Sequence, residues 1–183
     1  METANLFFDK KDLKKCGENV IIGKTVRIRY PELVELGDNV IIDDFIYIST
    51  ALKIGSSVHI ASGCHLIGGK SCSVRIDSFS TLAPNVVLAA GSDDYVGGIG
   101  SPIVPDEVRG KPVLGNIWIK NYCIVGANSV ILPNVTINEG GCVGALSLVK
   151  NSIPAWELHA GIPATLIKKR DKETILENAK KYL

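Results

Sequence analysis

Residues 36–66 read LGDNVIIDDFIYISTALKIGSSVHIASGCHL and carry a large aliphatic residue at every sixth position. These positions are Leu36, Ile42, Ile48, Ile54, Ile60 and Leu66. Six is a multiple of the two-residue period of a β-strand but not of the 3.6-residue period of an α-helix, so only an extended chain keeps these side chains on one side. The pattern therefore predicts β-structure with one inward-facing residue in each six-residue unit.

The same spacing continues before and after this stretch. The further positions are Ile22, Ile28, Ile76, Leu82, Leu88, Val113, Ile119, Val125, Ile131, Ile137, Val143 and Val149, which brings the number to eighteen. A six-residue unit extends over roughly 20 Å and leaves no room for a hairpin, so we expect each unit to form one side of a coil. Three units close a triangular turn, and eighteen units predict about six coils in a prism roughly 29 Å tall.

The spacing is interrupted at residues 29–35, 67–75 and 89–112. Insertions in a solenoid fall at corners and project as loops, often on the functional face. The third interruption reads AAGSDDYVGGIGSPIVPDEVRGKP and is by far the longest. Loops of this length are usually functional or disordered, and this one is too apolar for simple disorder. We therefore expect it to contribute to a site.

Three segments are expected along the chain. Residues 1–19 form an N-terminal cap with a short helix over 9–16, residues 20–153 form the repeat, and residues 154–183 form an exit segment and a C-terminal helix. The last helix is predicted from Asp171 as its N-cap. Apolar residues then follow at helical spacing, namely Ile175, Leu176, Ala179 and Leu183. We expect this helix across the end of the prism or on a partner, because solenoid ends need caps.

Composition excludes several classes of protein. The 183 residues are 46% apolar and 21% charged, as in ordinary globular domains. With 20 Lys and Arg against 19 Asp and Glu there is no overall basic field, which argues against nucleic acid or a membrane as partner. No apolar stretch of about 18 residues and no secretory leader is present, so a cytoplasmic protein is expected. The five cysteines lack any Cys-x-x-Cys spacing, which predicts structural thiols and no metal site.

The repeat, over about residues 20–170, resembles that of the hexapeptide-repeat acyltransferases. This resemblance implies an all-β solenoid, a left-handed parallel β-helix of about six coils with a long protruding loop over about 89–112 and a short C-terminal α-helix. The handedness comes from the resemblance alone, because the spacing does not contain it.

The end of the repeat, residues 124–170, is similar to the C-terminal signature of galactoside and maltose acetyltransferases. The resemblance implies a homotrimer, with acetyl-CoA or another acyl-CoA as co-substrate in a groove between neighbouring prisms. Small residues one coil apart let an extended thioester arm approach the backbone, and basic residues can meet the coenzyme phosphates. The implied coenzyme-binding residues are Ala127, Ala145, Lys150, Pro163, Lys168 and Arg170. Relatives often have Thr-Lys where this chain has Lys150-Asn151.

The long loop differs from that of several sugar acetyltransferases, which carry a catalytic histidine at its start. Here the stretch reads Gly91-Ser92-Asp93-Asp94-Tyr95. Carboxylates bind or deprotonate an ammonium far more readily than they activate a hydroxyl. The loop thus resembles that of N-acyltransferases for nucleotide-linked amino sugars, including 4-amino-4,6-dideoxy sugars. The expected roles are catalysis for Asp93 and acceptor binding for the others, Asp94, Tyr95 and Arg109.

Acyl transfer to a protonated nucleophile also requires a base, and the chain contains three histidines. His59 and His65 each end a six-residue unit, so both are expected to project outward, at successive corners and not side by side. His65 precedes an interrupted coil and is the candidate catalytic residue, while His59 is a candidate for acceptor binding. His159 lies in the exit segment.

The resemblance, together with the residues of the loop, implies an acyl-CoA-dependent transferase acting on the amino group of a nucleotide-linked amino sugar, in the synthesis of surface polysaccharide or lipopolysaccharide. An O-acetyltransferase acting on a sugar hydroxyl is the alternative, and a non-catalytic solenoid scaffold is a remote one. A zinc lyase of the γ-type carbonic anhydrase kind needs three converging imidazoles, which His59 and His65 do not supply. The acceptor sugar and the acyl chain length are left open.

Overall fold

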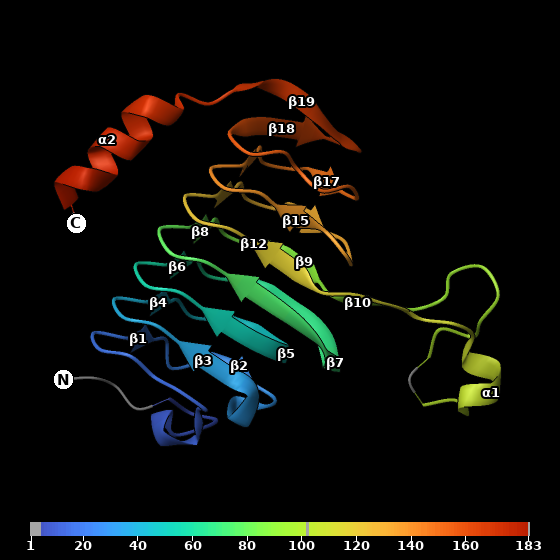
Figure 1. Ribbon diagram of the computed structural model, residues 1–183. Helices are drawn as coiled ribbons and strands as arrows, with labels where there is room; N and C mark the ends of the chain where they lie inside the picture. Colours follow the sequence, from blue (N-terminus) through green and yellow to red (C-terminus); the bar gives the residue numbers. More distant parts are fainter. Residues whose placement is uncertain (1–4, 102, 183) are drawn as a thin grey trace.

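A computed structural model of the protein describes residues 5–101 and 103–182 and shows a parallel β-solenoid of about seven turns (Figure 1). The predicted fold class is thus confirmed, with slightly more turns than the expected six. Three walls of short strands meet at three corners. We call the corner from wall 1 to wall 2 corner 1, the corner from wall 2 to wall 3 corner 2, and the corner from wall 3 to the next coil corner 3.

Successive coils place their strands in parallel register. Wall 1 contains β1 (Ile21–Ile22), β4 (Ile41–Ile42), β6 (His59–Ile60), β8 (Thr81–Leu82), β13 (Ile124–Val125), β16 (Cys142–Val143) and β18 (Glu157–Gly161). Wall 2 contains β2 (Arg27–Ile28), the first parts of β5 (Tyr47–Ile54) and β7 (His65–Ile76), β9 (Val87–Ala89), β14 (Val130–Ile131) and β17 (Leu148–Val149). Wall 3 contains β3 (Val34–Leu36), the second parts of β5 and β7, β12 (Ile117–Ile119) and β15 (Thr136–Ile137).

The inward-facing aliphatic residues form a single narrow core. All but one of the eighteen predicted positions are buried. The exception is Val113, which is 52% exposed and lies in β11 (Val113–Leu114), where it pairs with Ser92 of β10 (Gly91–Ser92). The prediction for Val113 was wrong because the long loop extends past residue 112 and its two ends pair with each other. Ile153, 1% exposed and bridged to Ile137, takes the remaining place in wall 3.

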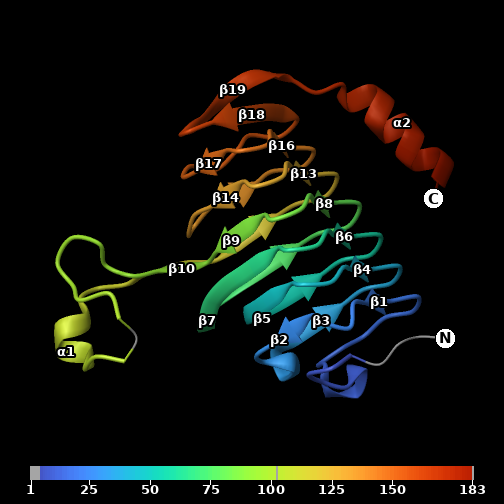
Figure 2. The ribbon, with the colours of Figure 1, turned by 180° about the vertical axis from the view of Figure 1, so that it is seen from behind.

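All three interruptions of the repeat lie at corner 2. The first contains the 3₁₀ turn η2 (Pro31–Leu33) and the second is the middle of β7. They pack on each other, because Lys70 Nζ lies 3.5 Å from Glu32 Oε1 and 4.8 Å from the centre of the Tyr30 ring. The third projects away from the prism and contains α1 (Asp106–Arg109), on the side opposite to α2 (Figures 1 and 2).

The two ends of the solenoid are covered differently from what the sequence predicted. At the N-terminal end, the expected helix over 9–16 is one 3₁₀ turn, η1 (Lys10–Asp12), with Asp9 as its N-cap. At the other end, β18 and β19 (Ala164–Lys169) form an antiparallel hairpin over the last coil.

The C-terminal helix α2 (Lys172–Tyr182) lies beside the coils at corner 3, and not across the end of the prism (Figure 1). The aromatic rings of Phe79, Tyr122 and Trp156 stack on one another at this corner, and Tyr182 of α2 meets the Phe79 ring edge-on at 6.1 Å. This contact explains the position of the helix. Leu183, the last of its predicted apolar residues, lies outside the described residues.

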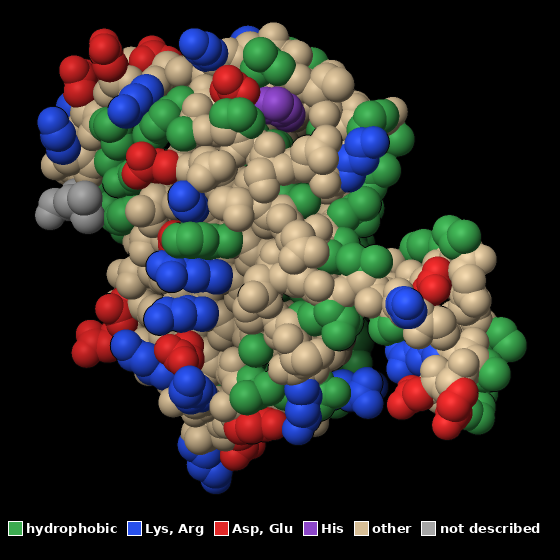
Figure 3. Space-filling view, turned by 45° about the vertical axis from the view of Figure 1, so that its right-hand side comes forward, with side chains coloured by type: hydrophobic (Ala, Val, Ile, Leu, Met, Phe, Trp, Pro, Cys, Tyr) green, Lys and Arg blue, Asp and Glu red, His purple; other side chains and the backbone are tan. Residues whose placement is uncertain are grey.

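The outer faces of the walls differ in character. Wall 3 carries a stack of charged side chains, visible as blue and red groups in Figure 3. Trp118 lies there between Arg75 and Lys120, at 4.6 and 4.8 Å from the ring centre, and its Nε1 donates to Asp77. Wall 1 instead exposes aliphatic residues to its outside, namely Ile21, Ile41 and Ile124. Wall 3 is thus suited to water, whereas wall 1 is suited to contact with another apolar surface. Within the described chain, no helix has the length and hydropathy that a membrane span requires.

Candidate active site

The long loop is attached to corner 2 by a short clasp. Its ends pair as β10 and β11, and the Gly115 amide donates to the Ala90 carbonyl at 2.8 Å. Gly91 packs closely on Gly68 of β7, where an added Cβ would lie 3.1 Å from the Gly68 Cα. A side chain at residue 91 would push the clasp away from the wall, so glycine fixes the direction in which the loop leaves the prism.

The two adjacent loop carboxylates have different surroundings. Asp94 Oδ1 accepts hydrogen bonds from the amides of Val96 and Gly97, and its Oδ2 accepts one from Lys111, each at 3.0 Å. These amide bonds, led by those of Gly97 and Lys111, lower the pKa of Asp94 to about 2. Asp94 therefore ties the outgoing arm of the loop to the returning arm, and its described contacts are structural.

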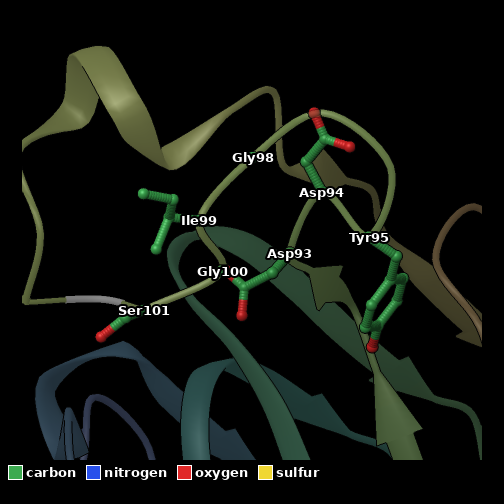
Figure 4. Close-up of a pocket in the computed structure, with 7 residues that line it drawn as sticks. All are labelled: Asp93, Asp94, Tyr95, Gly98, Ile99, Gly100 and Ser101. Carbon is green, nitrogen blue, oxygen red and sulfur yellow. The ribbon is translucent and has the colours of Figure 1, made fainter.

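Among the described residues, no backbone amide donates to the Asp93 side chain. Its Oδ1 lies 3.4 Å from Arg109 Nη2, and the buried Arg109 Nε has no hydrogen-bond partner within the described residues. Figure 4 shows the Asp93 and Asp94 carboxylates pointing in opposite directions. An open pocket of about 500 Å³ lies here, lined by Asp93, Asp94, Tyr95, Gly98, Ile99, Gly100 and Ser101. Asp93 thus brings an anionic group to the pocket, and the Arg109 guanidinium lies against that carboxylate.

The tip of the loop is apolar and uncovered. Tyr95 is 90% exposed and Val96 fully exposed, and Ile99, Ile103 and Val108 are also exposed. A folded monomer in water gains nothing from holding five such side chains on an extended loop, which points to a missing contact surface.

His59 and His65 occupy equivalent positions at the start of two successive walls, so they follow successive corners and do not lie side by side. His59 is the first residue of β6 in wall 1 and His65 is the first residue of β7 in wall 2, with Ile60 and the corner 1 turn of residues 61–64 between them. Six residues cross one corner because each unit contains both a strand and a turn. His65 Nδ1 bonds the Gly63 carbonyl at 3.0 Å, and His59 Nε2 lies 2.9 Å from Asp43 Oδ2.

Corner 1 also carries the small residues near the end of the repeat. Ala127 and Ala145 occupy it two and three coils above the histidines, and the Leu146 amide donates to the Ala127 carbonyl at 2.9 Å. Neighbouring backbones touch here, since a Cβ on Gly126 would lie 2.5 Å from the Ala145 amide nitrogen. Pro163, in the β18–β19 turn, continues the same edge. Ala127 is partly exposed and Ala145 and Pro163 are exposed, and we call these three residues the strip of small residues.

The basic residues predicted for the coenzyme lie elsewhere. Lys150 follows wall 2 and is exposed at corner 2, and Lys168 is exposed in β19, opposite Leu158. Arg170 is at corner 3, where its Nη1 donates to the carbonyls of Tyr122 and Gly140 at 2.8 and 2.6 Å. The structure therefore separates these three side chains from the strip of small residues, and Arg170 fastens the exit hairpin to the prism.

One chain does not bring the two halves of the predicted site together. Asp93 lies in the loop that leaves corner 2, whereas His65 begins wall 2 and His59 begins wall 1, and no contact joins Asp93 to either histidine among the described residues. Sequence reasoning also missed two carboxylate–imidazole pairs, Asp43–His59 and Glu157–His159, the latter at 2.8 Å. The signal for the first was a spacing of 16 residues, close to one coil.

No protein-family model matches the chain, but individual relatives do. The dTDP-4-amino-4,6-dideoxy-D-glucose acyltransferase of Escherichia coli is 33% identical over 167 residues, which are 88% of this chain and 85% of that protein. The chain belongs to the hexapeptide-repeat sugar acyltransferases. The galactoside O-acetyltransferase of E. coli strain K12 is 30% identical to the present chain over 150 residues, which are 79% of this chain and 70% of that protein.

Solved structures agree. AntD, an N-acyltransferase from Bacillus cereus in complex with dTDP and 3-hydroxybutyryl-CoA, superposes with a TM-score of 0.88 at 33% identity over 98% of both chains. A maltose O-acetyltransferase from Clostridium difficile superposes with a TM-score of 0.60 at 20% identity, over 89% of this chain and 73% of that one, and shows the common fold. The protein is an acyltransferase that uses a coenzyme A thioester.

Proposed function

We propose that this acyltransferase transfers an acyl group from a coenzyme A thioester to the amino group of a nucleotide-linked amino-dideoxy sugar, for surface polysaccharide or lipopolysaccharide. The observation that carries the proposal is Asp93, the loop carboxylate whose oxygens accept from no backbone amide of residues 5–101 and 103–182. Two relatives support it: the E. coli acyltransferase named for dTDP-4-amino-4,6-dideoxy-D-glucose, and AntD variants in complex with dTDP-4-amino-4,6-dideoxyglucose and coenzyme A.

In the proposed mechanism, Asp93 binds the sugar ammonium and Arg109 holds the Asp93 carboxylate and faces the diphosphate. Tyr95 packs on the sugar or the base, while Asp94 keeps the loop closed. The thioester arm lies along corner 1 against Ala127 and Ala145. The ammonium first loses one proton to a base. The neutral amine then attacks the thioester carbonyl, the C–N bond forms and the C–S bond breaks, and the sulfur takes the second proton from the nitrogen and leaves as the coenzyme A thiol.

We propose that the site is completed by a second copy in a cytoplasmic homotrimer. The loop at corner 2 and the strip at corner 1 are separated in one chain, and the uncovered loop tip and the aliphatic outer face of wall 1 are both suited to a neighbour. We expect sedimentation equilibrium at micromolar concentration to give three times 19.6 kDa, about 59 kDa. A species of 19.6 kDa would contradict both the trimer and the shared site.

Thiol release from acetyl-CoA tests the reaction. We expect release with nucleotide amino sugars and not with plain saccharides. Longer acyl-CoA donors are compared in the same assay. Release with saccharides alone would instead show an O-acetyltransferase, and failure of the folded trimer to bind acetyl-CoA in calorimetry would favour a scaffold.

A further inference from the structure

A carboxylate and an imidazole form a pair on the outer side of wall 1. Asp43 follows β4 and His59 belongs to β6, one coil further along. Asp43 Oδ2 and His59 Nε2 are 2.9 Å apart, and each side chain is a little under half exposed. With Nε2–H donating to Asp43, the other ring nitrogen, Nδ1, carries the lone pair, and the hydrogen bond fixes the orientation of the ring. An imidazole held by a carboxylate is the usual construction of a general base.

Asp43 is available for this contact because the adjacent residue, Asp44, accepts the hydrogen bonds that stabilise the turn. Asp44 Oδ1 accepts from the Thr25 amide at 2.9 Å and from the Thr25 hydroxyl at 2.7 Å, and these bonds lower the pKa of Asp44. The Thr25 hydroxyl oxygen in turn accepts from the Phe45 amide. The turn that carries Asp43 is therefore anchored independently of the Asp43 side chain.

The pair lies on the edge that carries the strip of small residues. Asp43 begins a corner 1 turn, and Gly126 begins the corresponding turn three coils higher. The coil of Ala127 lies two coils above that of His59, a rise of roughly 10 Å at the usual spacing of strands, and the coil of Ala145 is one higher. An extended arm that runs down this edge from the Pro163 turn past Ala145 and Ala127 leads to the coils of His59 and His65. The reactive end of the coenzyme then faces the histidines, and the diphosphate end faces the exit hairpin.

We infer that His59, oriented by Asp43, is the general base that removes a proton from the acceptor ammonium. This inference rests on the proposed function and reverses the roles that the sequence suggested for the two histidines. His65 bonds only the Gly63 carbonyl among the described contacts, so no carboxylate stabilises its protonated form.

The proton balance is simple. His59 Nδ1 takes one proton from the ammonium that the loop of a second copy delivers, and the resulting imidazolium is stabilised by Asp43. The amine attacks the thioester carbonyl, forming the C–N bond, and the tetrahedral intermediate expels the thiolate as the C–S bond breaks. A second proton passes from the nitrogen to the sulfur, and the imidazolium releases its own proton to water. The sum is amide, coenzyme A thiol and one proton.

The groups that face His59 favour this assignment. β6 packs against β4 and β8, whose outward side chains beside His59 are the uncharged Ile41 and Thr81. Thr81 Oγ1 donates to the His59 carbonyl and leaves the ring free. The remaining charged groups of the corner are Asp44, which Thr25 engages, and Lys24, which acts on Asp44. Asp43 is thus the charged group in direct contact with the imidazole.

The test is the pH dependence of thiol release with an amino-sugar nucleotide in wild type, His59→Gln and Asp43→Asn, each as the full chain. We expect kcat of His59→Gln to fall roughly 100-fold at pH 7 and the deficit to shrink as the pH rises, because the acceptor amine then loses its proton to water. Asp43→Asn should show a smaller loss of the same shape. Melting temperature and acetyl-CoA binding, measured on the same samples, report folding.

The matched control is His159→Gln, which breaks the second carboxylate–imidazole pair four coils from His59. We expect it to keep the wild-type shape of the pH profile. His65→Gln should also keep the acid limb of that profile.

A folded His59→Gln variant with wild-type kcat, or with a deficit that is the same at every pH, would overturn the inference. Loss of the acid limb in His65→Gln instead of His59→Gln would overturn it too. If His59→Gln does not fold, the profiles of Asp43→Asn and His65→Gln decide. Wild-type protein that binds acetyl-CoA but releases no thiol with any amine would refute the proposed function itself, which is a different result.

Discussion

Two Asp-Asp pairs, Asp43–Asp44 at corner 1 and Asp93–Asp94 in the long loop, share the same division of hydrogen-bonding roles between their carboxylates. In each pair the second carboxylate accepts hydrogen bonds from the surrounding turn, and its pKa is lowered by them. The first carboxylate is left to meet one basic side chain, His59 at 2.9 Å or Arg109 at 3.4 Å. Because the second carboxylate accepts the hydrogen bonds of the turn, the first carboxylate of each pair is available to contact a substrate or a basic side chain.

The partners make the difference. An imidazole can accept and release a proton near neutral pH, whereas a guanidinium cannot. The first pair can therefore build a base, and the second can only attract and hold charge. The supports differ as well, since Asp44 anchors a turn inside the hydrogen-bonded stack of coils, while Asp94 anchors a loop that leaves it. The comparison assigns proton transfer to the rigid corner and acceptor capture to the projecting loop.

The largest effect in the loop is expected from Asp93→Asn. The change keeps the shape but removes the charge that binds the ammonium, so we expect kcat/KM for the amino-sugar acceptor to fall about 100-fold while acetyl-CoA binding is kept. Thiol release at varied acceptor concentration measures it. Asp106→Asn, in α1 of the same loop, is the control and should change kcat/KM little. A wild-type kcat/KM in Asp93→Asn would remove Asp93 from the site.

Asp94→Asn should act indirectly. Asparagine replaces one accepting oxygen by an NH₂ group. Either the contacts from the Val96 and Gly97 amides or the contact from the Lys111 amide is then lost, and the two arms of the loop separate more easily. We expect kcat/KM to fall about 10-fold, mainly through a higher KM, with faster amide hydrogen exchange at Val96, Gly97 and Lys111. Unchanged exchange rates together with a large loss of kcat would show that Asp94 contacts the acceptor itself.

Titration distinguishes the anchored loop acid from an ordinary one. Because the folded pKa of Asp94 is about 2, its contribution to loop closure is complete above the ordinary value of 3.8 and is lost as the pH falls through about 2. We expect the amide NMR shift of Gly97 to titrate with a midpoint near pH 2 in wild type and to be flat in Asp94→Asn. A midpoint at the ordinary value would mean that the three hydrogen bonds do not persist in solution.

The smallest effect is expected at the corner. Asp44→Asn weakens the contacts with Thr25, but the coil above and the coil below still hold this turn through their backbone hydrogen bonds. We expect the melting temperature to fall by roughly a few degrees and thiol release at 25 °C to stay near wild type. Loss of activity without loss of stability would mean that Asp44, and not only Asp43, takes part in catalysis.

Much of the fold could be predicted because the signal was repeated. Each inward aliphatic residue tests the same period, so an error at one position, Val113, did not affect the others. The prediction failed at Val113 because the loop ends pair as β10 and β11. This contact joins residues more than 20 apart in the sequence and leaves no periodic signal. The C-terminal helix was found from its spacing, but its place at corner 3 depends on the contact of Tyr182 with Phe79.

The site was less accessible to sequence reasoning. Asp93 and Asp94 are equivalent in the sequence, and only the direction of the backbone amides separates their tasks. The pairing of Asp43 with His59 depends on how many residues one coil contains, which varies with each insertion. Arg170 was expected to meet the coenzyme phosphates, yet the hairpin of β18 and β19 carries it back across wall 1 to corner 3, where it donates to backbone carbonyls.

The clasp closes the base of the long loop through the pairing of β10 with β11 and through the 2.8 Å hydrogen bond from the Gly115 amide to the Ala90 carbonyl, so the chain returns to the position from which it left. The register of the coils above and below therefore does not depend on the length or sequence of the segment between these two residues. Residues 91–114 can be regarded as an exchangeable cassette, so that acceptor preference can diversify by grafting while the coenzyme track of the scaffold is inherited unchanged.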